Sequence, residues 1–131
     1  GGHVSRLMSQ VGHQSCERVM SEKTARQILD MLGTVVGPKG TGKRAAVEGY
    51  LVGGKTGTAH KVGRGGYEDS EYTAVFAGIA PISDPELVLA VIVDEPQGKE
   101  YYAGEVAATV FSRAMEQALR LRKVIPDSPV V

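Results

Sequence analysis

The stretch TAVFAGIAPISDPELVLAVIV, residues 73–93, contains two apolar runs separated by a short polar segment. The runs at 73–80 and 87–93 are rich in the β-branched and other apolar residues that favour buried strands. Between them, PISDPE contains two prolines and a Ser-Asp pair, which are typical of a tight turn. The stretch therefore predicts a β-hairpin between two well-buried strands.

The residues before this hairpin predict a third strand. GGKTGTAHKV, residues 53–62, is joined to the first run by GRGGYEDSE, residues 63–71, at the distance of a hairpin connection. The segment VEGYLV at 47–52 is expected to be a short strand or a turn. The sequence therefore predicts three consecutive antiparallel strands.

Segments with helical periodicity lie on both sides of the predicted strands. The first helix is expected to begin after Ser21 as its N-cap and to end at Gly37-Pro38. Its apolar stripe comprises Ala25, Ile28, Leu29, Leu32, Val35 and Val36. A second amphipathic helix is expected over 105–122. The fold class is therefore α+β, with a three-stranded antiparallel meander flanked by helices.

Composition limits the classes of function. The chain has 131 residues, which is the size of one domain, and its 15 basic and 15 acidic side chains cancel. No overall field favours nucleic acid or an anionic membrane, so nucleic acid is not an expected partner. The longest apolar run, 87–93, is far below the roughly 20 residues of a membrane-spanning helix.

Metal ligands of the usual kind are scattered. His3, His13, Cys16 and His60 do not form the paired clusters that zinc prefers. No metal and no cofactor are expected.

A phosphate-binding loop is one reading of GPKGTGKR, residues 37–44, which nearly fits G-x-x-x-x-G-K-[ST]. Arg44 occupies the last position, where a hydroxyl would bind Mg²⁺. The preceding segment has helical period, whereas such a loop follows a buried strand. A flexible basic loop is the favoured interpretation, and nucleotide binding is kept as an alternative.

The KTGT segment can line a ligand site. Lys55 and Gly57 alternate with Thr56, Thr58 and His60, so the two sets lie on opposite faces of the strand. A glycine in mid-strand often marks the close approach of a ligand or of another backbone. A ligand beside this strand could bind main-chain groups, threonine hydroxyls and the ammonium through its carboxylate. The alternative is a plain hairpin strand with an exposed lysine.

Four blocks in order, GGKTGTAHKV, FAGIAP, VIVDEP and YYAG, resemble the C-terminal part of the transpeptidase domain of class B penicillin-binding proteins, the septal cell-wall type. The resemblance runs over nearly the whole chain. It implies a penicillin-binding and β-lactamase-like fold and a serine D,D-transpeptidase. Such an enzyme attacks the D-Ala-D-Ala end of a peptidoglycan stem peptide, forms an acyl-enzyme and cross-links stems, and β-lactams trap its serine.

The resemblance also assigns roles to residues. Lys55 is expected to supply positive potential and assist proton movement, and Thr56 to bind the substrate or β-lactam carboxylate. Gly57 gives clearance, and the backbone N–H of Thr58 is one oxyanion-hole donor. Three further residues are expected in the pocket wall, with ordinary packing as the alternative: His60, Tyr72 and Tyr102.

Two of the three family motifs are missing. No serine in the chain has a lysine three residues later, and the sequence contains no asparagine, so neither S-x-x-K nor S-x-N is present. Residues 1–131 are therefore expected to be the C-terminal portion of the domain, inactive alone. The rest of the domain and division proteins are expected partners, at the periplasmic face of the bacterial inner membrane. A non-catalytic peptide-binding module remains an alternative.

Overall fold

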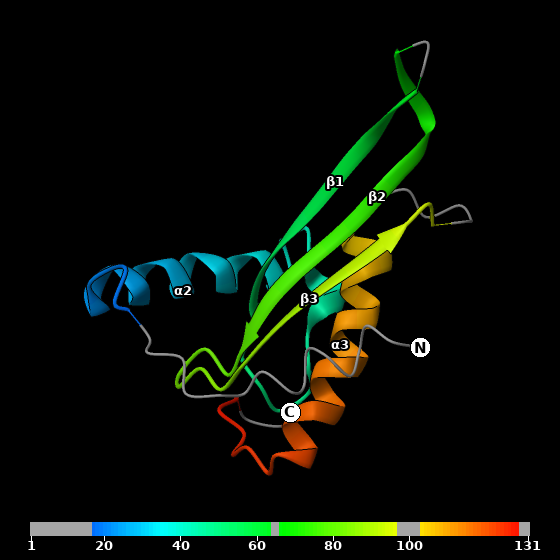
Figure 1. Cartoon of the computed structure of the whole chain (residues 1–131). Helices are drawn as coiled ribbons and strands as arrows, with labels where there is room; N and C mark the ends of the chain where they lie inside the picture. The colour runs from blue at the N-terminus through cyan, green and yellow to red at the C-terminus, as the bar shows by residue number, and fades with distance from the viewer. Residues whose placement is uncertain (1–16, 64–65, 97–102, 129–131) are drawn as a thin grey trace.

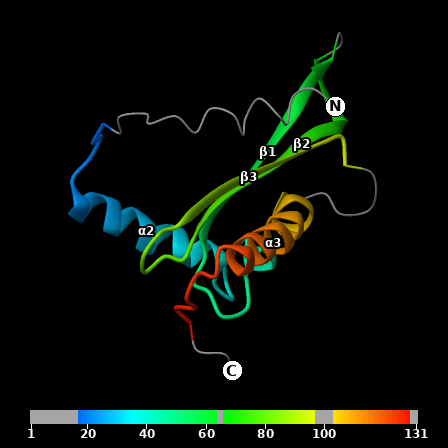
Figure 2. The same cartoon turned by 60° about the horizontal axis from the view of Figure 1, so that its bottom comes forward.

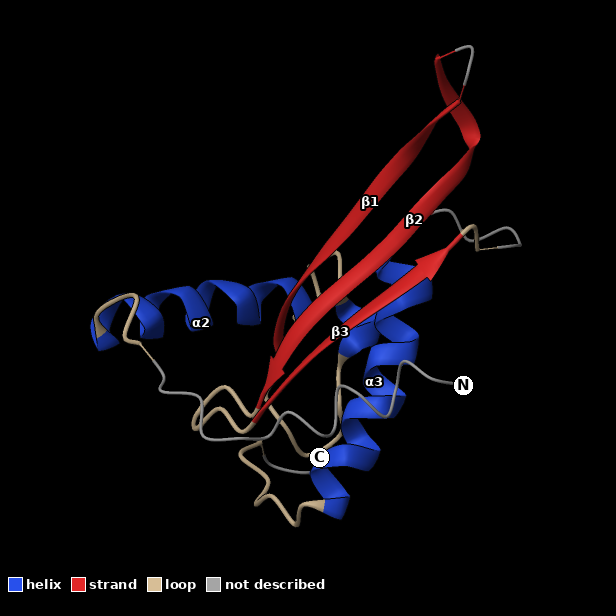
Figure 3. Cartoon of the chain, viewed as in Figure 1, coloured by secondary structure: helices blue, strands red, loops and turns tan. Residues whose placement is uncertain are grey.

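The computed structural model describes residues 17–63, 66–96 and 103–128. Within these ranges, two helices and one short 3₁₀ helix pack around a three-stranded antiparallel sheet of order β1-β2-β3 (Figure 1, Figure 3). The elements, in chain order, are α2 (Glu22–Val36), η1 (Lys43–Ala45), β1 (Gly53–Gly63), β2 (Gly66–Ala80), β3 (Leu87–Asp94) and α3 (Ala103–Leu121). The predicted α+β meander is confirmed.

The β1–β2 hairpin is longer than predicted. The pairing of β1 with β2 continues to Gly63↔Gly66, and β3 pairs only with residues 73–80 of β2, so the hairpin extends beyond β3 (Figure 1). The prediction that 63–71 is a connecting segment was therefore wrong over most of its length. Glycines and acidic residues disfavour strands locally, but pairing with a neighbour outweighs intrinsic propensity.

Helix α2 begins and ends where the sequence predicts. The Ser21 hydroxyl accepts a hydrogen bond from the backbone N–H of Thr24 at 3.1 Å, which satisfies one of the free donors of the first turn. Gly37 is the C-cap. The Arg26 guanidinium donates to the carbonyls of Ile82 and Ser83, at 2.8 and 3.2 Å, and so joins α2 to the β2–β3 turn.

The core lies between the sheet and α3, which runs along one face of it (Figure 2). Four large side chains are fully buried there: Phe76, Phe111, Met115 and Leu119. Phe76 from β2 meets Phe111 from α3 edge to face, with ring centroids 4.8 Å apart. Complete burial of these residues makes the α3 side of the sheet the main source of its hydrophobic stabilisation.

The opposite face of the sheet is apolar but largely uncovered within the described residues. Alternate residues of β3 point away from α3, and Val88 and Ile92 are 76% and 69% exposed. Large exposed apolar patches of this kind often mark interaction surfaces.

The segment after α3 folds back onto the residues that immediately precede β1. The Asp127 carboxylate accepts from the backbone N–H of Leu51 at 2.7 Å. It also accepts from the backbone N–H and the hydroxyl of Ser83, at 3.2 and 2.7 Å. The Tyr50 hydroxyl donates to the carbonyl of Val124 at 2.7 Å. The C-terminal segment thus fixes the chain just before the KTGT strand.

Asp127→Ala is expected to lower the free energy of unfolding by about 2 kcal/mol, because three donors lose a charged acceptor. Asp127→Asn keeps one acceptor oxygen and should cost less. Denaturant unfolding of the protein measures both, with Asp84→Ala in the neighbouring turn as the control for an exposed carboxylate. Equal stability of Asp127→Ala and Asp84→Ala would contradict the tethering role.

Candidate active site

The KTGT strand presents its side chains on two faces of the sheet, as predicted. Thr56 and Thr58 lie opposite Phe76 and Ala74 of β2, and so belong to the face that carries the core. Lys55 and Gly57 belong to the other face. Strand β1 lies at one end of the strand order, so within the described residues one side of its backbone has no strand neighbour. An extended ligand can approach that side.

Lys55 forms part of the lining of an apolar pocket. Its side chain is exposed, and its Nζ donates to the carbonyl of Thr56 at 2.8 Å. The pocket, of about 530 Å³, lies between α2 and the sheet face that α3 does not cover, and Lys55 is the charged member of its lining. Neighbouring apolar surface lowers the local dielectric, so the ammonium attracts an anion more strongly here than in open water.

Thr56 and Thr58 offer two hydroxyls on the core-facing side. Thr56 is half-buried, and its hydroxyl oxygen lies 3.3 Å from that of Thr41, in the loop after α2. Thr58 and His60 are exposed. A carboxylate beside the strand could therefore accept hydrogen bonds from threonine hydroxyls, which donate well to charged acceptors.

Gly57 has open space above it. Among the described residues, a Cβ atom built there would meet only the Cβ of Val75, at an ordinary 3.7 Å. Gly54 differs, because its Cβ would come within 2.7 Å of the backbone carbonyl oxygen of Ala77. Packing inside the described structure therefore requires a glycine at 54 but not at 57, and the expected clearance for a ligand at Gly57 stays a prediction.

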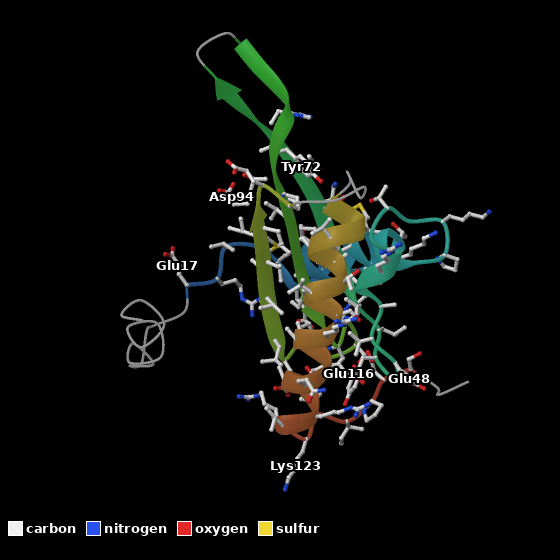
Figure 4. All side chains as sticks on the ribbon, turned by 90° about the vertical axis from the view of Figure 1, so that its right-hand side faces the viewer. Glu17, Glu48, Tyr72, Asp94, Glu116 and Lys123 are labelled. Carbon is white, nitrogen blue, oxygen red and sulfur yellow. The ribbon has the colours of Figure 1, made fainter. Side chains whose placement is uncertain are left out.

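The three predicted pocket-wall residues have different positions. His60 is exposed on β1, with its ring centroid 6.5 Å from that of Tyr72. Tyr72 is only 5% exposed and belongs to the core, near the end of the sheet that carries Asp94 and far from Lys123 (Figure 4). This burial is consistent with ordinary packing, and a place for Tyr72 in the pocket wall stays a prediction. Tyr102 lies outside the described residues.

The 37–44 segment does not have the geometry of a phosphate-binding loop. It follows helix α2 instead of a strand, and it leads into the 3₁₀ helix η1, which is three residues long. Lys43 and Arg44 are both exposed. Such a loop requires a strand before it and a helix N-terminus after it, and neither is present.

The described residues contain neither a cluster of metal ligands nor a membrane-spanning helix. In the ranges given above, no three His, Cys, Asp or Glu side chains are grouped so that they could hold a metal ion. None of the helices seen there combines the length and apolar character needed to cross a bilayer. His3, His13 and Cys16 lie outside the described residues.

Residues 5–116 match the family model of the penicillin-binding protein transpeptidase domain. The match covers most of the 131 residues and includes α2, the KTGT strand and most of α3. The chain belongs to this family of penicillin-binding transpeptidase domains.

The names of similar proteins are consistent with membership of this family. Over 112 residues, the chain is 43% identical to peptidoglycan D,D-transpeptidase FtsI of Buchnera aphidicola subsp. Schizaphis graminum, covering 86% of this chain and 20% of that protein. It is 42% identical to the Escherichia coli K12 protein of the same name, covering 86% and 19%. The transpeptidase domain of Burkholderia pseudomallei penicillin-binding protein 3 superposes with a TM-score of 0.80 at 45% identity, over 92% of this chain and 36% of that structure. The chain thus spans about a fifth of the length of the curated relatives it matches.

Proposed function

We propose that this chain supplies the substrate-binding edge of a peptidoglycan D,D-transpeptidase, the activity named for its relatives. The observation that carries the proposal is the exposed Lys-Thr-Gly-Thr segment on an end strand of the sheet, in a family member. The substrate is the D-Ala-D-Ala end of a stem peptide, and β-lactams bind as its mimics. No cofactor is required.

The proposed reaction has two acyl transfers. A serine oxygen attacks the carbonyl carbon of the penultimate D-alanine, its proton passes to a base, and the terminal D-alanine departs as an amine. An amine of a second stem then attacks the acyl-enzyme and frees the serine. Thr56 binds the substrate carboxylate and Lys55 provides the positive potential that holds it. The N–H of Thr58 donates to the oxyanion of each tetrahedral intermediate.

The serine and its base come from outside these 131 residues, because the chain contains no S-x-x-K. We propose that residues 1–131 are the C-terminal portion of the transpeptidase domain, and that the remainder packs on the face exposing Val88 and Ile92. Two observations support this: that face is apolar, and the chain matches only 36% of the solved transpeptidase domain. A structure of the whole protein with this face still open to solvent would contradict the arrangement.

The remaining assignments follow from the same proposal. The enzyme acts at the periplasmic face of the inner membrane, where peptidoglycan lies, and its anchor is outside this chain. Its protein partners are components of the cell-division machinery. Co-purification of the full-length protein with cell-division proteins, which fails when the membrane anchor is removed, tests both statements.

Labelling with a fluorescent penicillin tests the function. The full-length protein should be labelled once per molecule, whereas residues 1–131 alone should not be labelled. In the full-length protein, Thr56→Val should lower the acylation rate about tenfold, because a hydrogen bond to a charged group is lost. Lys43→Ala removes an exposed cation of the 37–44 segment and should leave the rate unchanged.

Two outcomes would overturn the proposal. Labelling of a serine within residues 1–131 would contradict the external nucleophile. A full-length protein that binds stem peptide but is never acylated would favour the non-catalytic binding module.

A further inference from the structure

The loop at 37–42 is held beside the KTGT strand by backbone hydrogen bonds and close packing. Its backbone closes on itself and on α2, with the N–H of Gly40 donating to the carbonyl of Gly37 at 2.8 Å and that of Gly42 to Val35 at 2.9 Å. A Cβ on Gly40 would collide with the carbonyl oxygen of Val35. These glycines allow a close approach that other residues would prevent.

The same loop lies against the residue that faces Thr56. A Cβ on Gly42 would come within 2.9 Å of the Cε2 atom of Phe76, and Phe76 is the partner of Thr56 across the sheet. Phe76 is fully buried, so it provides a fixed support for both segments. Thr41 is exposed, but its neighbour Gly42 is buried against Phe76, so the core anchors the backbone next to Thr41.

Thr41 reaches the hydroxyl that is proposed to bind the carboxylate. The two hydroxyl oxygens, one from Thr41 and one from Thr56, are 3.3 Å apart. A threonine hydroxyl carries one proton and can accept through its oxygen. If Thr56 donated that proton to Thr41, it would have none for a ligand. If Thr41 donates to Thr56, the Thr56 proton is free to point at a carboxylate.

We propose that Thr41 is a positioning residue of the carboxylate site, donating its hydroxyl hydrogen bond to Thr56 Oγ1 and thereby directing the Thr56 proton toward the ligand. The inference rests on the proposed function. A donor to the Thr56 oxygen also polarises its O–H bond, since chains of hydrogen bonds strengthen one another. The glycine-rich loop thus serves the acyl-transfer site and not a nucleotide.

The test is a double-mutant cycle in the full-length protein. The acylation rate constant is measured with benzylpenicillin, which carries the carboxylate, and with its uncharged methyl ester. Thr41→Val should lower the rate with benzylpenicillin about fivefold, the effect of one modest hydrogen bond. Thr41→Ser should keep at least half of the wild-type rate. In a Thr56→Val background, Thr41→Val should cause no further loss, because its target is gone. The methyl ester should react equally with wild type and Thr41→Val.

Thr34→Val is the matched control, because the Thr34 hydroxyl donates to the carbonyl of Met31, at 2.7 Å, within α2. It should leave both rates unchanged, and thermal melting of every variant reports folding. Thr41→Ala serves as a second deletion of the hydroxyl and should behave as Thr41→Val.

Several results would overturn the inference while leaving the proposed function intact. They are a wild-type rate for Thr41→Val, an equal loss with the methyl ester, an additive loss in the Thr56→Val background, or a Thr41→Ser variant as slow as Thr41→Val. A wild-type protein that is not acylated by either compound overturns the proposed function and this inference with it.

Discussion

Replacement of Lys55 by alanine in the full-length protein should lower the acylation rate by a fluorescent penicillin about 10²-fold or more. The ammonium is proposed to combine two tasks, attraction of the carboxylate and assistance to proton movement, so its loss should affect both binding and chemistry. No other residue of the strand is expected to cost as much.

Arginine at position 55 separates the two tasks. Lys55→Arg keeps the positive charge but replaces a compact ammonium with a planar guanidinium that does not release its proton. Ligand affinity should therefore fall little, while the acylation step should remain slow. Stopped-flow measurement of binding and acylation distinguishes the two, with Lys39→Ala, another exposed lysine, as the control. If Lys55→Ala is acylated at the wild-type rate, the proposed role of this residue is wrong.

The fold was predictable wherever local patterns agreed with tertiary structure. Ser21 and Gly37 mark the limits of α2 by capping chemistry, and PISDPE marks the β2–β3 turn by its prolines, so both boundaries follow from short-range physics. The segment 63–71 was misjudged because its glycines and acidic residues disfavour a strand, while its pairing with β1 depends on a neighbour. Local propensity carries no information about that neighbour.

The candidate site was likewise predictable only in those features that depend on local sequence patterns. The alternation of Lys55 and Thr56 across the strand follows from the two-residue period of a β-strand alone. The burial of Tyr72 does not, because it depends on how α3 covers the sheet. Thr41 carried no signal of its own in the sequence, since its contact with Thr56 requires the loop after α2 to close against Phe76. The glycines on both sides of Thr41 can be seen in the sequence, but the close backbone and side-chain contacts that require them are seen only in the structure.

Two glycines of β1 should respond to alanine in opposite ways. Gly54→Ala is expected to destabilise the protein by about 3 kcal/mol, because its Cβ would come within 2.7 Å of the backbone oxygen of Ala77, which cannot move without disturbing the ladder. Gly57→Ala should leave stability unchanged or slightly raised, because its Cβ meets Val75 at an ordinary distance and alanine loses less entropy on folding. Its acylation rate should nevertheless fall about 10²-fold, because the methyl group displaces the ligand from the strand.

This pair separates a glycine needed for folding from a glycine needed for binding, within one strand and with one type of substitution. Denaturant unfolding and penicillin acylation are measured on both variants in the full-length protein. Rapid acylation of a stable Gly57→Ala variant would mean that no ligand passes close to that face, and the KTGT strand would then have to bind its substrate through the side chains of Thr56 and Thr58 alone. A stable Gly54→Ala variant would instead show that β1 can shift relative to β2. Because Thr56 and Thr41 belong to segments that both rest on Phe76, such a shift would also alter the distance between their hydroxyls.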